Sequence, residues 1–252
     1  MPRRPPVLPK VQHFTREEFI AYRFDHRWGE HVAILGPTGW GKTTLAQQLL
    51  APLSTPDEPT VCLVMKARDA TVQRFGKEQG FRRIATWPPP VYRTAKMSSA
   101  RPPGFLLWPK HTFNPDVDEP KMHATFRAAM TDAMKRGKGI KLFADEVADL
   151  GRRTLKLERV IDNFMSQARS LDASMFAATQ RPFNAPASIY GQSTHLFIGR
   201  DSDRRSQQRY EEIGDCDPEL ITHVTQGLHK YEWFYMRKPT DRSDTVMCIV
   251  GA

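Results

Sequence analysis

A short apolar run followed by a glycine-rich loop constrains this chain more than any other stretch. Residues 31–35 (His-Val-Ala-Ile-Leu) predict a buried strand, and residues 36–44 read Gly-Pro-Thr-Gly-Trp-Gly-Lys-Thr-Thr. The loop contains the P-loop or Walker A pattern, Gly-x-x-x-x-Gly-Lys-Thr, in which backbone between a strand and a helix cradles phosphate groups. Apolar residues at helical spacing follow in residues 45–50. The sequence therefore predicts a nucleotide-binding loop within an α/β domain.

The residue types of this loop suit phosphate binding. Glycines let the backbone N–H groups turn toward an anion, and the free N–H groups and dipole of the following helix favour it further. We expect Lys42 to reach the β- and γ-phosphates and the Thr43 hydroxyl to bind Mg²⁺. The predicted cofactors are therefore ATP and Mg²⁺. The predicted nucleotide-binding residues are Gly36, Pro37, Thr38, Gly39, Trp40, Gly41, Lys42, Thr43 and Thr44.

Two consecutive carboxylates follow the predicted strand at residues 140–144. Asp145 suits the Walker B role, in which a carboxylate holds Mg²⁺ directly or through water. Glu146 can polarise a water molecule for attack on the γ-phosphate. The alternative is a solvated pair of acidic residues at the start of a loop.

Two further polar residues flank the predicted strand at residues 174–179. Gln180 follows this strand, where it could hydrogen-bond the attacking water or the γ-phosphate, or simply cap the strand end. Arg169 ends a helix predicted at residues 157–168. It could act as an arginine finger on a neighbouring subunit's phosphate, or bind the last carbonyl groups of its own helix.

Strands that alternate with amphipathic helices predict a mainly parallel sheet with helices on both faces. Because ligands bind such sheets at the carboxyl ends of the strands, one cleft should collect the P-loop, the two carboxylates and Gln180. A helix that carries Pro120 in its first turn has a methionine-rich apolar face, which predicts core packing rather than a ligand site. Residues 231–236 and 246–250 predict a terminal hairpin.

The run at residues 167–182, Gln-Ala-Arg-Ser-Leu-Asp-Ala-Ser-Met-Phe-Ala-Ala-Thr-Gln-Arg-Pro, resembles the HerA/FtsK superfamily of DNA-pumping ATPases. In that family an arginine-bearing helix end precedes a strand that ends in Ala-Thr-Gln-Arg-Pro, and the P-loop and carboxylate pair have the matching order and spacing. The resemblance covers residues 28–235. It implies a RecA-like P-loop NTPase core, a homo-oligomeric ring and ATP-driven translocation of double-stranded DNA. It also implies ATPase roles for Lys42, Thr43, Asp145, Glu146 and Gln180.

The sequence departs from this family in two respects. Lys141 interrupts the usual apolar Walker B strand, which favours a place for that strand near a sheet edge or a subunit contact. No membrane segment or winged-helix module of the family is recognised. We therefore expect a compact motor, similar to the small genome-packaging ATPases of viruses or to motors of mobile elements. The ring would be a hexamer or pentamer that docks on a portal, capsid or membrane pore without inserting into the membrane.

The expected organisation is one large domain with short extensions. Residues 1–27 would form a basic proline-rich arm and a short helix, residues 28–235 the ATPase domain, and residues 236–252 a C-terminal strand or tail. The three cysteines are far apart and predict free thiols in a reducing compartment. With no secretory signal and no long apolar run, we expect a cytoplasmic location, in the host cytoplasm if the protein is viral.

A formal net charge of +9 favours polyanionic partners. Two basic stretches could face double-stranded DNA in a channel, and the alternative is that they are solvated surface. One stretch lies in a loop rich in proline and serine, and the other follows the predicted Walker B carboxylates. The candidate DNA-binding residues are Arg93, Lys96 and Arg101 in the first stretch and Arg152, Arg153 and Lys156 in the second.

Three other functions compete with DNA translocation. The chain could be the ATPase subunit of a tailed-phage terminase, with its nuclease on another chain because the residues after Pro182 are too few for a nuclease fold. It could be a secretion ATPase that moves protein, or a regulatory module that binds nucleotide without hydrolysis. Glu146 argues against the last of these, because binding alone does not require a carboxylate that polarises water.

Overall fold

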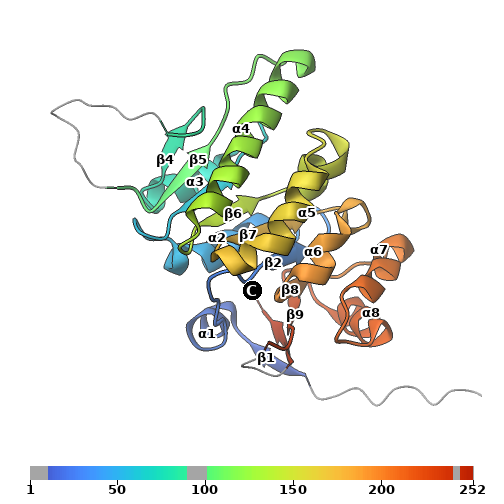
Figure 1. Cartoon of the computed structure of the whole chain (residues 1–252). Coiled ribbons are helices and arrows are strands. Elements are labelled where there is room, and N and C mark those ends of the chain that lie inside the picture. The colour runs from blue at the N-terminus through green and yellow to red at the C-terminus, as the bar shows by residue number, and fades with distance from the viewer. Residues whose placement is uncertain (1–10, 90–100, 241–244, 252) are drawn as a thin grey trace, which may run out of the picture.

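The computed structural model describes residues 11–89, 101–240 and 245–251. Ten strands form one sheet in the order β1-β10-β9-β8-β2-β7-β6-β3-β5-β4 (Figure 1). The seven strands from β8 to β4 are parallel, whereas β9 is antiparallel to both β8 and β10. The strands are β1 (Gln12–Phe14), β2 (Val32–Leu35), β3 (Thr60–Leu63), β4 (Arg82–Ile84), β5 (Gly104–Leu107), β6 (Lys141–Ala144), β7 (Ser174–Thr179), β8 (His195–Ile198), β9 (Trp233–Arg237) and β10 (Val246–Val250).

Helices cover both faces of this sheet, as the sequence predicts (Figure 1). The α-helices are α1 (Arg16–Tyr22), α2 (Lys42–Leu50), α3 (Ala70–Glu78), α4 (Pro115–Arg136), α5 (Glu158–Gln167), α6 (Ala187–Gln192), α7 (Arg204–Gln208) and α8 (Pro218–Gly227). The shorter helical turns are η1 (Ala51–Leu53), η2 (Asp149–Arg153), η3 (Ala168–Leu171), η4 (Pro182–Asn184) and η5 (Arg209–Glu212).

Alternate residues of each central strand belong to two separate cores, because successive side chains of a strand point to opposite faces. In β2, Val32 and Ile34 lie in the core formed with α1, α2 and α3. Ala33 and Leu35 lie in the core formed with α4, α5, α6 and α8. A strand buried on both faces has no polar side, which explains why residues 32–35 form an uninterrupted apolar run.

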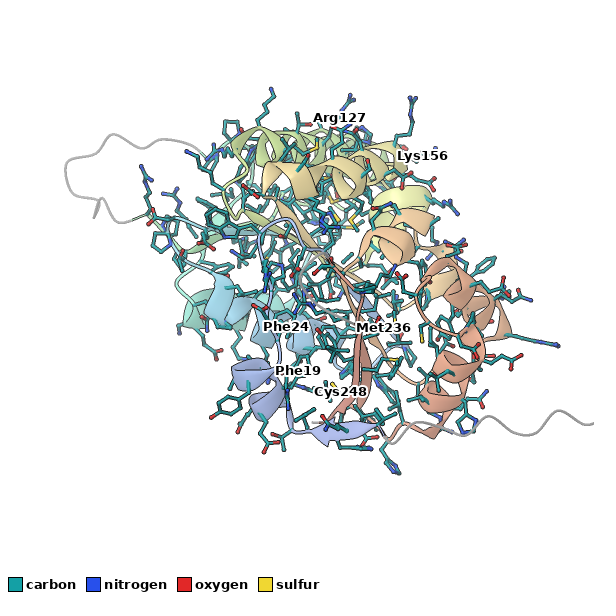
Figure 2. The ribbon with its side chains drawn as sticks, turned by 60° about the horizontal axis from the view of Figure 1, so that its bottom comes forward. Phe19, Phe24, Arg127, Lys156, Met236 and Cys248 are labelled. Atoms are coloured by element: carbon teal, nitrogen blue, oxygen red, sulfur yellow. The ribbon has the colours of Figure 1, made fainter. Side chains whose placement is uncertain are left out.

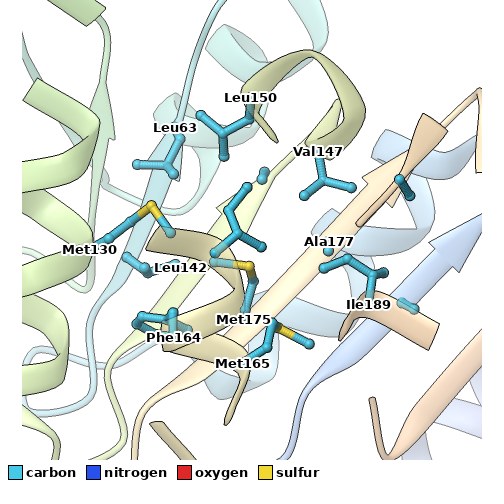
Figure 3. Close-up of a cluster of buried hydrophobic side chains, with 14 of the residues drawn as sticks. Leu63, Met130, Leu142, Val147, Leu150, Phe164, Met165, Met175, Ala177 and Ile189 are labelled. Carbon is cyan, nitrogen blue, oxygen red and sulfur yellow. The ribbon is translucent and has the colours of Figure 1, made fainter. Parts of the chain in front are cut away.

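The methionine-rich face of α4 packs in the larger core, as predicted. Figure 3 shows Met130 of α4 in the same cluster as Phe164 and Met165 of α5, over Leu142 of β6 and Met175 of β7. Methionine suits such a position because its flexible thioether fills irregular gaps between helices and a sheet.

The start of α4 differs from the prediction. Asn114 caps this helix by accepting a hydrogen bond from the backbone N–H of Asp116, and Pro115 is its first residue. Pro120 therefore lies inside the helix rather than in its first turn. Asn114 fixes the start of the helix because its side chain satisfies an N–H group that has no partner within the helix. Proline lacks a backbone N–H, so Pro120 leaves out one hydrogen bond of the helix, and the helix continues beyond it.

The expectation that Lys141 marks a sheet edge is wrong. Its strand, β6, lies between β7 and β3 in the interior of the sheet, and the Lys141 side chain is 1% exposed. Its Nζ donates to Gly139 O (2.8 Å) and Glu58 O (3.2 Å) and lies 3.5 Å from Glu58 Oε2. Burial lowers the Lys141 pKa, and Glu58 opposes this shift. A lysine is tolerated here because it is the first residue of its strand, where loop carbonyl groups accept hydrogen bonds from its ammonium group.

The segments before and after the predicted ATPase domain both contribute to the sheet. Strands β9 and β10 form the predicted hairpin, and β1 pairs with β10. The predicted boundary between residues 235 and 236 falls inside β9. Phe19 of α1 is fully buried in the same core as Cys248, at the end of the molecule seen at the bottom of Figure 2. Among the described residues, no helix combines the length and apolar character needed to cross a membrane.

Candidate nucleotide-binding site

The P-loop, the two carboxylates and Gln180 line one cavity at the carboxyl ends of the parallel strands. Strand β7 lies between β2 and β6, so Gln180 lies between the loop and the carboxylates. The cavity has a volume of about 510 Å³, within the usual range for small-molecule sites. The sheet order thus gathers residues from three separate parts of the sequence.

The loop itself has the backbone geometry that an anion site requires. Gly39 and Gly41 have φ angles of 76° and 82°, in the left-handed region that other residues adopt only at a cost of about 1–2 kcal/mol. Helix α2 begins at Lys42, directly after Gly41. The free N–H groups of its first turn therefore face the same space as the loop.

Lys42 is buried and belongs to the loop's own hydrogen-bond network. Its Nζ donates to Pro37 O (2.8 Å). Burial lowers the Lys42 pKa, while Glu146 and Asp145 favour the charged form. The ammonium group therefore lies close to both the loop backbone and the two carboxylates, as a cation that neutralises phosphate must.

Thr43 and Asp145 form an oxygen-rich pair. The Thr43 hydroxyl donates a hydrogen bond to Asp145 Oδ1 (2.5 Å), which joins the first turn of α2 to the end of β6. A hydroxyl and a carboxylate are the donor types that Mg²⁺ prefers, and both side chains line the cavity. The donor set therefore fits Mg²⁺.

Glu146 is held in place by residues at the end of β7. It accepts hydrogen bonds from the Thr179 hydroxyl (2.5 Å) and from the backbone N–H of Gln180 (3.0 Å). The Gln180 side chain in turn accepts from the Thr38 hydroxyl (2.5 Å). Burial raises the Glu146 pKa, and Asp149 adds to this effect, whereas its hydrogen bonds oppose it. The carboxylate is thus connected to the P-loop through Gln180.

Lys66 is a cation in the cavity that the sequence analysis missed. Its Nζ lies 3.1 Å from Asp145 Oδ2 and 3.3 Å from Asp69 Oδ2. Burial alone would lower the Lys66 pKa, but the carboxylates of Asp145 and Asp69 outweigh it and raise the pKa. The available signal was position, because Lys66 closely follows β3, the neighbour of β6. The sequence analysis also missed Thr179, whose only signal was its position as the last residue of β7.

Arg169 lies at the opposite edge of the sheet from the P-loop of its own chain. It is exposed in η3, and its backbone packs against Gly29, just before β2 begins. The carbonyl group of Ala168 accepts from the backbone N–H of Ala173 (3.0 Å), and Asp172 adopts a left-handed conformation that turns the chain. Backbone groups therefore cap this helix end, which leaves the Arg169 side chain available for another role.

The predicted basic stretches lie in different places. Arg152 and Arg153 are in η2, where Arg152 pairs with Glu158 and Arg153 lies 3.1 Å from Asp149. Lys156 lies at the outer surface, toward the top of Figure 2. Arg101 precedes β5 at the amino edge of the sheet, on the side away from the P-loop. Arg93 and Lys96 lie outside the described residues.

No protein-family model and no curated protein matches the sequence. Solved structures do resemble it. The genome-packaging NTPase B204 of Sulfolobus turreted icosahedral virus 2, in complex with sulfate, is 12% identical with a TM-score of 0.58, and the match covers 87% of this chain and 95% of B204. B204, the DNA-packaging ATPase of Sulfolobus turreted icosahedral virus, is 15% identical with a TM-score of 0.57, covering 88% and 98%.

A second kind of ATPase shares the same architecture. The cytoplasmic domain of the type VII secretion ATPase EccC of Thermomonospora curvata is 14% identical with a TM-score of 0.55, and the match covers 88% of this chain and 25% of EccC. At these identities the likeness concerns the fold alone. The chain therefore has the predicted fold, a mainly parallel α/β sheet with helices on both faces, as in a RecA-like P-loop NTPase core.

Proposed function

We propose that this chain is an ATPase that translocates double-stranded DNA, in viral genome packaging or in the transfer of mobile DNA. The observation that carries the proposal is the single cavity in which Lys42, Thr43, Asp145, Glu146 and Gln180 meet. The structures of B204 solved in complex with AMPPCP and ATP-gammaS support ATP as the ligand. The similarity to a DNA-packaging ATPase and the net charge of +9 favour DNA as the cargo.

The chemistry follows from the placement of these groups. The loop N–H groups would hold the phosphates, and Lys42 would neutralise their charge. Thr43 and Asp145 would hold Mg²⁺, which neutralises negative charge on the phosphates when bound. Glu146 would take a proton from the attacking water, and Gln180 would orient that water while its backbone N–H holds Glu146.

The proposed ring assembly gives Arg169 a role across a subunit interface. Arg169 lies far from its own P-loop, so only another subunit could present a phosphate to it. Its exposure and the backbone capping of η3 support this proposal. Residues supplied in trans at such sites stabilise the charge of the transition state.

Mixing two inactive variants tests this interface. We expect Arg169→Ala and Lys42→Ala subunits each to be inactive alone and to regain partial ATPase activity when mixed in one ring. In a random one-to-one mixture, about a quarter of the interfaces pair an intact P-loop with an intact arginine. A double Arg169→Ala/Lys42→Ala variant mixed with a single variant should recover nothing. If neither mixture shows ATPase activity, in rings shown to contain both variants, Arg169 has only a structural role.

Duplex DNA is expected to stimulate ATP hydrolysis, and a triple alanine variant of Arg152, Arg153 and Lys156 should weaken this response. Exposed ion pairs such as Arg153–Asp149 contribute only about 0–1 kcal/mol, so exchanging Asp149 for a DNA phosphate costs little. Each lost phosphate contact should reduce the salt dependence of DNA affinity by about one unit of slope. Basal hydrolysis should be unchanged.

The matched control removes three exposed basic residues from the opposite edge of the sheet: Arg27, Lys135 and Lys138. The total charge then changes by the same amount, so only position distinguishes the variants. If both triple variants bind DNA alike, the η2 stretch makes no specific contact. If the wild-type enzyme hydrolyses ATP but neither binds DNA nor is stimulated by it, the likeness to EccC favours a second candidate function, an ATPase that moves protein.

A further inference from the structure

The order of the strands indicates how a nucleotide would lie along the edge of the sheet. The residues proposed to act on the γ-phosphate follow β7 and β6, on one side of the P-loop strand β2. Strands β8 and β9 lie on the other side of β2. A nucleoside triphosphate is a linear molecule with its base at the end away from the γ-phosphate. The base should therefore lie on the β8–β9 side of the loop.

An exposed aromatic ring occupies that side. Tyr231 lies in the turn that leads into β9, two residues before the strand begins, and it is 41% exposed. A Cβ atom placed on Gly41 would lie 3.5 Å from Tyr231 Cδ1, so the ring lies against bare glycine backbone at the start of α2. The ring is thus next to the phosphate loop but outside the cavity that holds Glu146.

The backbone of Tyr231 is held in an unusual conformation. Its φ angle is 72°, which is uncommon for a bulky residue. The Arg16 guanidinium donates to Tyr231 O (3.0 Å) and to Gln48 Oε1 (3.1 Å). Trp40, within the P-loop, donates from Nε1 to Glu232 O (2.9 Å). Contacts from α1 and from the loop thus fix this turn, and such imposed conformations are often found at ligand sites.

We propose that Tyr231 forms the base-binding subsite of the nucleotide site by stacking against the base. The inference rests on the proposed function, because it requires a nucleotide phosphate chain in the P-loop. The exposed Lys230 ammonium lies 4.9 Å from the centroid of this ring. An aromatic ring beside the loop gives a base a planar surface for stacking, and it reads no hydrogen-bonding edge. The subsite should therefore accept adenine and guanine alike, and bind the smaller pyrimidine bases less tightly.

The test compares ATP with inorganic tripolyphosphate, which carries the phosphates without a base. We expect Tyr231→Ala to weaken ATP binding by about 5- to 150-fold, the range measured for stacking of one base. The same variant should bind tripolyphosphate as the wild type does. Tyr231→Phe keeps the ring and should bind ATP almost normally. Tyr22→Ala removes a tyrosine that is 82% exposed on α1 and serves as the matched control.

Each contrary result has a separate meaning. Wild-type ATP affinity in Tyr231→Ala would overturn the stacking proposal. An equal loss of ATP and tripolyphosphate binding would also overturn it, because Tyr231 would then only support the loop. If wild-type protein binds tripolyphosphate as tightly as ATP, the base adds no affinity and the subsite does not exist. If wild-type protein binds neither compound, the proposed function fails, and the subsite fails with it.

Discussion

Replacing Glu146 with glutamine is expected to lower ATP turnover by about 10²- to 10⁴-fold, the usual contribution of a general base. ATP binding should stay near the wild-type value. Glutamine has the same shape, so its carbonyl oxygen can still accept from the Thr179 hydroxyl or the Gln180 N–H. It cannot take a proton from water. Equilibrium ATP binding and single-turnover hydrolysis, measured on the same preparation, separate the two effects.

Asp149→Asn is the matched control, because it changes a second carboxylate of the same cavity into an amide. Its maximal turnover should lie close to that of the wild type. Near-normal turnover of Glu146→Gln would remove Glu146 from the catalytic role. An equal loss in both variants would point to the overall charge of the cavity rather than to a general base.

The pH dependence of hydrolysis provides a second readout of the same residue. Burial raises the Glu146 pKa above its ordinary value, so more of the carboxyl group is protonated at a given acidic pH. Since only the ionised form accepts a proton, activity should fall on the acid side at a higher pH than an exposed glutamate would give. Asp149 contributes to this shift. Asp149→Asn should therefore move the acid limb toward lower pH.

Local chemistry made much of the fold predictable. The P-loop pattern, the apolar strands and the 3.6-residue periodicity of the helices each depend on residues that are close in sequence. Parallel sheets also gather their loops at one edge, so the proximity of Asp145 and Gln180 to the loop followed from topology alone. These features could be predicted because neighbouring residues, or a general rule of sheet construction, determine them.

The errors and omissions involve contacts between residues that are distant in sequence. The charge of Lys141 led to the prediction of a sheet edge, but backbone carbonyl groups of Gly139 and Glu58 accept hydrogen bonds from its ammonium group inside the molecule. Lys66 gains its role only because β3 pairs with β6. Tyr231 reaches Gly41 because β9 folds back beside β8. No local pattern contains this information, because strand order decides which loop ends meet.

Replacing Lys42 with alanine should abolish tight ATP binding. The loop would keep its glycine conformations and its inward N–H groups, which depend on the backbone, but it would lose its buried cation. Removing one partner of a buried charge pair costs about 2–5 kcal/mol, which corresponds to a loss in affinity of about 30- to 5000-fold. ATP titration of the folded variant measures this loss, and thermal unfolding checks that the fold is intact.

Lys66→Ala distinguishes this specific role from a general effect of positive charge, because both lysines line the same cavity. The Lys66 side chain is 60% exposed, so solvent screens its charge, and its removal should weaken ATP binding much less. Lys42 is buried against the loop, where a phosphate would replace the Pro37 carbonyl as its partner. Equal losses in the two variants would mean that the cavity attracts ATP only through its net charge. Wild-type affinity in Lys42→Ala would mean that the phosphates bind outside this loop.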